Sequence, residues 1–389
     1  MKKKICLFLL CLLSVIACAL DLSACGEETV KKAPEEATEE TTEETVKKAT
    51  DGLSYVLNGD SYSCNGIGTS TETEIVIASE YNGYSVTSIE EYAFEGCSSL
   101  TSIMIPDSVT SVGNRAFSHC SSLTNVTIPD SVTSVGTLTF WDCTSLRNIT
   151  LPESVTFISD SVFFGCYQLR YNEYENANYL GNDNNPYVAL ISAKSIYITT
   201  CTINNNTKII ATNAFEDCSL LTSIVIPDGV MNIGELTFHG CSALKNITIP
   251  DSVTSIGIEA FEDCSSLKNI TIPDSVTGIG DFAFSGCCNL KNVILGDGVT
   301  SIGRLAFSGC YNLKSTILGD SVTRIGEYAF GDCRSLTSIK IPDRVTSMES
   351  SVFLNCNSLT IYCEAADNPS GWSADWNPND RPVVWNYKG

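Results

Sequence analysis

Apolar side chains recur along this chain with a period of 23 residues, far longer than the period of a single helix or strand. Phenylalanine marks each period, and a cysteine follows it by three residues and a leucine by six. The eleven phenylalanines are Phe94, Phe117, Phe140, Phe163, Phe215, Phe238, Phe261, Phe284, Phe307, Phe330 and Phe353. A unit of 23 residues cannot bury its own apolar face. The pattern therefore predicts a solenoid in which each coil packs on its neighbours, so that equivalent residues of successive coils form a column.

One unit, residues 244–264, shows the elements to expect: LKNITIPDSVTSIGIEAFEDC. Ile247 and Ile249 alternate with polar residues, which predicts one short strand. Pro250 ends that strand because proline cannot donate a hydrogen bond to a β-ladder. The residues around Phe261 predict a short helical or 3₁₀ segment. Successive strands should lie parallel and about 4.8 Å apart, forming a sheet on one face of the solenoid.

The motif IPxSVTxIGxxAFxxCxxLxxIxI resembles the BspA-like class of leucine-rich repeats in bacterial surface proteins, over residues 51–389. The resemblance implies a leucine-rich-repeat solenoid that is mostly β, with short helical or 3₁₀ turns. At the ladder position, where commoner leucine-rich repeats carry asparagine, this chain has Ser252 and its equivalents. The class also implies binding to host matrix proteins or to other cells.

Three segments depart from the period. Residues 51–88 predict a β-hairpin that caps the first coil, and residues 364–389, which contain three tryptophans, predict a cap on the last. Caps are expected because an open solenoid exposes sheet edges. The repeats occupy residues 89–363, and one step of 52 residues among them predicts a hairpin inserted at about 170–195.

The N-terminal residues predict export. Three lysines precede an uncharged apolar run of 16 residues, whereas a membrane-spanning helix needs about 20. The sequence LSAC, followed by Gly26, resembles a bacterial lipoprotein box, which implies a signal peptide at 1–24 and lipid attachment at Cys25. A weaker match ends at Cys18, and an ordinary secretion signal is the other alternative. We expect an exported protein that is lipid-anchored to the bacterial cell membrane and faces the exterior.

Charge and composition exclude several function classes. Residues 25–50 are rich in glutamate and threonine, which predicts a disordered acidic tether. The net charge of −22 argues against a nucleic-acid partner. His119 and His239 are the only two histidines, and they fall in different columns on distant coils. Because no catalytic, phosphate-binding or zinc motif is present, we expect no enzyme activity, no cofactor and no metal site.

The cysteines of the repeat allow two interpretations. Adjacent coils would bring their Cα atoms to about 4.8 Å, which is within disulfide range. However, eleven is an odd number, and each cysteine of the column has two equal neighbours. We therefore predict free thiols that fill a small inward slot as buried apolar side chains.

Candidate binding residues lie at the outward positions of the predicted strands. The lysine column consists of Lys245, Lys268, Lys291 and Lys314, and the asparagine column beside it contains Asn246, Asn269 and Asn292. Stacked like charges repel each other. The lysines therefore either pair with an acidic column, formed by Asp251, Asp274, Asp297 and Asp320, or meet an anionic ligand. A third interpretation is that they only protect exposed strands from aggregation.

These features predict a monomeric surface protein that binds an extracellular protein or a glycan without catalysing a reaction. The alternative is a structural or scaffolding module of the cell envelope that has no soluble ligand. A binding face should depart from the repeat consensus, whereas a spacer should follow it throughout.

Overall fold

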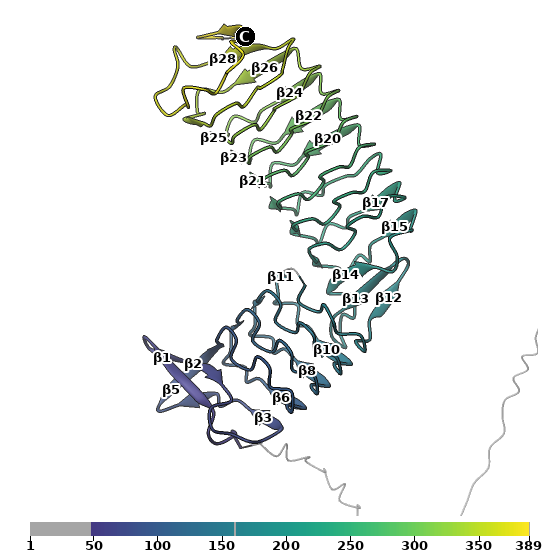
Figure 1. Cartoon of the computed structure of the whole chain (residues 1–389), viewed down its shortest axis with the longest axis vertical. Coiled ribbons are helices and arrows are strands. Elements are labelled where there is room, and N and C mark those ends of the chain that lie inside the picture. The colour runs from purple at the N-terminus through teal and green to yellow at the C-terminus, as the bar shows by residue number, and fades with distance from the viewer. Residues whose placement is uncertain (1–47, 159–160, 389) are drawn as a thin grey trace, which may run out of the picture. The chain divides into compact units, whose positions relative to one another are not determined.

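The computed structural model describes residues 48–158 and 161–388, which form one compact unit (Figure 1). The predicted signal peptide, the lipid-attachment residue Cys25 and most of the predicted tether lie outside the described residues. No helix in the described part is long and apolar enough to cross a membrane.

Most coils contribute two short strands, which pair in parallel with their equivalents in neighbouring coils. For example, β20 (Asn269–Ile272) pairs with β22 (Asn292–Leu295), and β21 (Gly278–Ile279) pairs with β23 (Ser301–Ile302). The coil at residues 244–249 is an exception, because its first segment forms only an isolated bridge at Asn246. The fold is a leucine-rich-repeat solenoid with repeats of 23 residues, as the sequence predicted. The sequence pattern predicted only inward-pointing turn residues where the second strand of each coil lies.

The strands form two rows that follow the coils in chain order (Figure 1). The first row contains β20 and β22 together with β3 (Glu74–Val76), β6 (Ser102–Met104), β8 (Asn125–Thr127), β10 (Asn148–Thr150), β15 (Thr200–Thr202), β17 (Ser223–Val225), β24 (Ser315–Ile317), β26 (Ser338–Ile341), β28 (Thr360–Cys363) and β29 (Val383–Val384). The second row contains β21 and β23 together with β7 (Ser111–Val112), β9 (Ser134–Val135), β11 (Phe157–Ile158), β16 (Ile209–Ile210), β18 (Asn232–Ile233), β19 (Ser255–Ile256), β25 (Arg324–Ile325) and β27 (Ser347–Met348).

The first described residues form a hairpin against the second row. Strand β1 (Ser54–Asn58) pairs antiparallel with β2 (Ser61–Gly66), and β2 pairs in parallel with β5 (Tyr84–Ile89). Strand β4 (Glu80–Tyr81) pairs antiparallel with β5, which in turn pairs with β7. Strand β2 therefore covers the edge that β5 would otherwise expose.

Tryptophans cover the last coil. The side chains of Trp372 and Trp376 are buried. The ring of Trp376 meets the ring of Phe353 edge-on, with centroids 6.1 Å apart and planes 80° apart. The indole N–H of Trp372 donates a hydrogen bond to the Val345 carbonyl oxygen at 2.8 Å. These contacts shield the apolar end of the phenylalanine column from water.

A three-stranded antiparallel insertion interrupts the repeats. Strands β12 (Asn172–Tyr174), β13 (Ala177–Leu180) and β14 (Ala189–Ala193) pair in that order, and β14 then pairs in parallel with β16. The insertion divides the apolar core into two clusters. Tyr179 on β13 is fully buried, and its hydroxyl accepts a hydrogen bond from the Asn204 backbone N–H at 3.3 Å.

Stacked phenylalanine rings form the centre of the core. The rings of Phe284 and Phe307 lie 5.2 Å apart with planes within 1° of parallel. Beside this stack, the cysteines of the described repeats are free thiols, which confirms the prediction. Most of them are buried, and Cys97 is half-buried.

The predicted helical or 3₁₀ segment is wrong, because the described residues contain no helix there and this part of each coil is a run of turns. Glu259 and Asp263 adopt left-handed backbone conformations, with φ of 53° and 55°. The Phe261 N–H donates to the Ala283 carbonyl oxygen of the next coil at 2.8 Å. Because this donor is used between coils and left-handed residues interrupt the segment, a helical hydrogen-bond ladder cannot form.

Candidate binding surface

The first row presents a regular outward face. In β22, Asn292 and Ile294 are exposed while Val293 and Leu295 are buried, which is the alternation expected of a strand with one face on the core. The same register continues into β24, where Ile317 lies opposite Ile294. Residues of one column are therefore neighbours on adjacent strands.

The four predicted lysines form a continuous exposed column. The Lys291 N–H donates to the Lys268 carbonyl oxygen at 2.8 Å, and the Lys314 N–H donates to the Lys291 carbonyl oxygen at 3.0 Å. Within residues 48–158 and 161–388, none of these lysines forms an ion pair. The proposed pairing with the acidic column is therefore wrong. Instead, a carboxylate oxygen of Asp274 accepts the Asp297 backbone N–H at 2.9 Å.

The asparagine column bonds to itself. The Asn292 side-chain amide donates to the Asn269 side-chain oxygen at 2.8 Å, and Asn148 donates in the same way to Asn125 at 2.7 Å. Asn246 continues the column through a backbone bridge to Ser223. These ladders satisfy part of the amide hydrogen-bonding capacity within the solenoid, so they stabilise the strand register.

Exposed aliphatic residues depart from the repeat consensus beside the lysines. Thr248 and Thr271 occupy the next outward column, but Ile294 and Ile317 replace threonine on β22 and β24. Ile294 is 45% exposed and Ile317 is 62% exposed. We call Lys291, Lys314, Ile294 and Ile317 the Lys–Ile patch. The Lys–Ile patch was not predicted from the sequence. The sequence does mark its two coils, because Leu-Gly follows Ile294 and Ile317 directly, whereas Ile-Pro follows the threonines Thr248 and Thr271.

A second group, which is only partly exposed, lies on the turn segments near the N-terminal end of the described residues. The Arg115 guanidinium lies 6.0 Å from the Tyr92 ring centre and 5.5 Å from that of Trp141. The His119 ring lies 4.7 Å from the Trp141 ring, and its Nδ1 lies 3.3 Å from an Asp142 carboxylate oxygen. Sequence reasoning missed this group because its members fall in columns that no repeat pattern marks.

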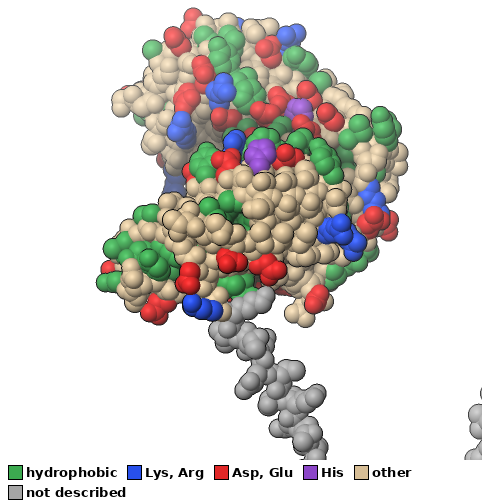
Figure 2. All heavy atoms as spheres, turned by 60° about the horizontal axis from the view of Figure 1, so that its bottom comes forward, with side chains coloured by type: hydrophobic (Ala, Val, Ile, Leu, Met, Phe, Trp, Pro, Cys, Tyr) green, Lys and Arg blue, Asp and Glu red, His purple; other side chains and the backbone are tan. Residues whose placement is uncertain are grey.

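Acidic side chains lie across much of the face drawn in Figure 2, with basic ones between them. Both histidines, in purple, lie beside acidic side chains. On a chain of net charge −22, the lysine column is thus a local exception to the overall field.

Two rows of parallel strands around a core of stacked phenylalanine and leucine columns define a bacterial-type leucine-rich repeat solenoid. The sequence matches the BspA type leucine rich repeat region in six copies, over residues 73–184, 193–314 and 255–366. The chain belongs to this family.

Several solved structures of bacterial leucine-rich repeat proteins are similar to this chain. One from Bacteroides ovatus is 26% identical, with 86% of this chain and 94% of that chain covered and a TM-score of 0.36. One from Eubacterium ventriosum is 24% identical, with 84% and 96% covered and a TM-score of 0.46. A leucine rich cell surface protein from Faecalibacterium prausnitzii is 24% identical, with 88% and 98% covered and a TM-score of 0.35. No curated protein matches the chain.

Proposed function

We propose that this protein is an exported, lipid-anchored module of a bacterial cell surface that binds an extracellular protein or glycan without catalysing a reaction. The lipoprotein box ending at Cys25 supports the anchor. Membership of the BspA type family supports a surface-binding role.

The Lys–Ile patch is the observation that carries the binding role. Its two lysines are exposed cations without an ion-pair partner in the described part of the chain, and its two isoleucines are exposed on adjacent strands. A spacer gains nothing from exposed isoleucine at a position where threonine serves elsewhere, because exposed apolar side chains on a sheet promote association. A ligand with an anionic group next to an apolar surface would contact the two lysines through its charge and the two isoleucines through its apolar surface.

The chemistry favours two kinds of ligand with this shared character. A sulfated or sialylated glycan offers anionic groups and the apolar faces of sugar rings. An acidic stretch of a matrix protein offers carboxylates and aliphatic side chains. Because the rest of the chain is acidic, long-range repulsion would oppose binding of either ligand elsewhere and restrict it to the lysine column.

The scaffolding role remains the second candidate, and the asparagine ladders favour it. In a ladder such as Asn269–Asn292, the side-chain amides form hydrogen bonds to each other along the solenoid. These bonds stiffen the first row, and the groups that form them are not offered to a ligand. A protein built only as a spacer would need these ladders and would not need the Lys–Ile patch.

The isoleucine pair provides the test. Ile294→Thr together with Ile317→Thr restores the residue of Thr248 and Thr271, so the fold should persist. We expect this variant to bind an array of sulfated glycans and acidic matrix proteins more weakly than the wild type. The matched control is Val225→Thr, which removes an aliphatic side chain that is 64% exposed in the same column but before the first lysine-bearing coil. Equal binding by all three proteins, or no binding by any, would contradict the proposal and favour the scaffold.

A further inference from the structure

The turn segments of three successive coils place one histidine between two glutamates. Glu216, His239 and Glu262 each follow the phenylalanine of their coil by one residue, so they form a column. The Nε2 atom of His239 lies 3.6 Å from a Glu262 carboxylate oxygen, and its Nδ1 atom lies 4.0 Å from a Glu216 carboxylate oxygen. The imidazole thus has a carboxylate on both sides.

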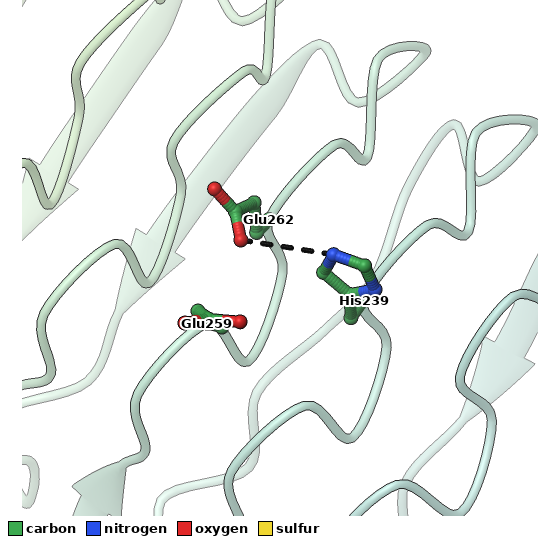
Figure 3. A group of neighbouring side chains, drawn as sticks. All are labelled: His239, Glu259 and Glu262. Atoms are coloured by element: carbon green, nitrogen blue, oxygen red, sulfur yellow. Dashed lines mark ion pairs between the residues drawn. The ribbon is translucent and has the colours of Figure 1, made fainter.

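A third carboxylate joins this column from the side. Glu259 stands in the same coil as Glu262, and its left-handed backbone, with φ of 53°, belongs to the turn before Phe261. One ligand atom each from His239, Glu259 and Glu262 lie within 4.8 Å of one another (Figure 3). Figure 3 shows His239 and Glu262 facing each other across neighbouring coils, with Glu259 beside Glu262.

These groups are partly withdrawn from water and are not neutralised by a side-chain cation. The side chains of His239 and Glu262 are 26% and 22% exposed. No lysine or arginine of the described ranges forms an ion pair with Glu216, Glu259 or Glu262. The Nδ1 atom of His239 is buried and has no hydrogen-bond partner.

We propose that His239, Glu259 and Glu262 bind a divalent transition-metal ion, with Zn²⁺ as the best fit. One imidazole nitrogen and two carboxylate oxygens are ordinary zinc ligands. Ligands of a tetrahedral zinc ion at about 2.0–2.1 Å stand roughly 3.4 Å apart. The separation of 3.6 Å between His239 Nε2 and Glu262 is close to this value, and Glu259 requires only a modest side-chain movement.

Glu216 has a different role in this proposal. When Nε2 ligates a metal, Nδ1 carries the ring proton, and metal-bound histidines usually donate that proton to a carboxylate or carbonyl oxygen. Glu216 is the carboxylate that faces Nδ1, and a small rotation of either side chain brings it within hydrogen-bond distance. It is thus a positioning residue, while His239, Glu259 and Glu262 are the ligands.

The ion would join two coils and leave one coordination position open. Three protein ligands on a tetrahedral ion leave a fourth position for water or for an anionic group of a bound molecule. The position lies among the turns, apart from the Lys–Ile patch on the first row. The proposal therefore does not depend on the proposed function.

The test is calorimetric titration of the full chain, stripped with a chelator and free of a histidine tag, with Zn²⁺. Accessible thiols are first alkylated, because thiolates also bind zinc. We expect one site, loss of measurable binding in His239→Gln, and affinity lowered by about tenfold or more in Glu216→Gln, as for other residues that orient a metal ligand. Glu259→Gln and Glu262→Gln should each weaken binding at least as much.

The chain supplies its own control. His119 also faces a carboxylate, from Asp142 at 3.3 Å, but it belongs to no group of three potential ligands among the described residues. His119→Gln should therefore bind Zn²⁺ like the wild type. Circular dichroism confirms that each variant is folded, and Co²⁺ binding should give an absorption spectrum without a thiolate band. Unchanged binding by His239→Gln, a thiolate band, or Ca²⁺ binding as tight as Zn²⁺ binding would overturn the proposal.

Discussion

The thiol of Cys287 donates a hydrogen bond to the Phe261 carbonyl oxygen of the preceding coil at 3.2 Å. The same bond links Cys264 to Phe238 and Cys310 to Phe284. The cysteine column is therefore a ladder of polar contacts inside the core as well as a filler of space. The Phe261 carbonyl oxygen also accepts the Cys264 backbone N–H at 3.2 Å, so the thiol of the next coil gives this carbonyl a second hydrogen bond.

Burial of this column predicts which thiols react. Burial raises the pKa of Cys120 to about 12 and that of Cys64 to about 11. Because the thiolate is the nucleophile, buried cysteines of the native protein should resist iodoacetamide at neutral pH. Cys97 and Cys288 are only half-buried and should be modified first. Mass spectrometry after native alkylation maps the sites, and rapid labelling of Cys287 would show that the column is open to solvent.

The same pKa values predict alkaline sensitivity. An unfolded cysteine titrates near pH 8.5, whereas Cys120 and Cys166 in the fold titrate at about 12. The folded state thus holds these protons more tightly, and their contribution to stability is complete below about pH 8.5 and falls as the pH rises toward 12. Urea unfolding midpoints should decline over this range. Cys120→Ala should reduce the slope of this decline, whereas a midpoint independent of pH would contradict the thiol burial.

The phenylalanine stack predicts a local response to mutation. Phe261→Ala should cost about 3–5 kcal/mol of unfolding free energy, as for other buried phenylalanines. Coils couple mainly to their neighbours, so hydrogen exchange should rise around residues 238–284 more than elsewhere. Ile258→Ala is the control, because Ile258 is 43% exposed in the same coil and should change little. Uniform protection after Phe261→Ala would mean that its ring does not support the core.

The anchor prediction concerns residues outside the described part of the chain. Cys25→Ala should block lipid attachment and processing, because the thiol of this residue carries the lipid in a lipoprotein box. The variant should leave the membrane fraction or keep its signal peptide, as judged by fractionation and metabolic labelling with a fatty acid. Cys18→Ala is the control and should behave like the wild type. The opposite pattern would move the attachment site to Cys18.

The period alone predicted the coils and nearly all of the core. A residue such as Phe261 or Leu244 repeats because every coil solves the same packing problem, so its burial follows from its column. The turn geometry could not be predicted in this way. Residues as different as Glu259, Leu236 and Phe282 all adopt the left-handed conformation at one column, so side-chain identity does not signal it.

Of the two candidate sites, only one follows from the repeat period. The lysine column is visible in sequence because its members recur at 23 residues. The group around His239 is not, because it combines two columns and depends on which side chains meet across coils. The expectation that two distant histidines cannot share a metal left out the carboxylates that face each of them, which are Asp142 at His119 and Glu216 and Glu262 at His239.

The lysine column gives the most direct test of the binding role. Lys245, Lys268, Lys291 and Lys314 are replaced together by threonine, the residue found in the same column at Thr124, Thr222 and Thr337. The fold should survive, and removal of stacked like charges relieves repulsion. A control variant, Lys194→Thr with Lys208→Thr, removes lysines outside the first row.

The decisive measurement is the affinity of these three proteins for immobilised sulfated glycans and acidic matrix proteins at low and at physiological salt. Exposed charges are screened as ionic strength rises. If the lysine column binds the ligand, the wild type and the control lose affinity as the salt concentration rises, and the quadruple variant binds weakly with little dependence on salt. Equal affinity and equal salt dependence for the quadruple variant and the wild type would contradict this binding role.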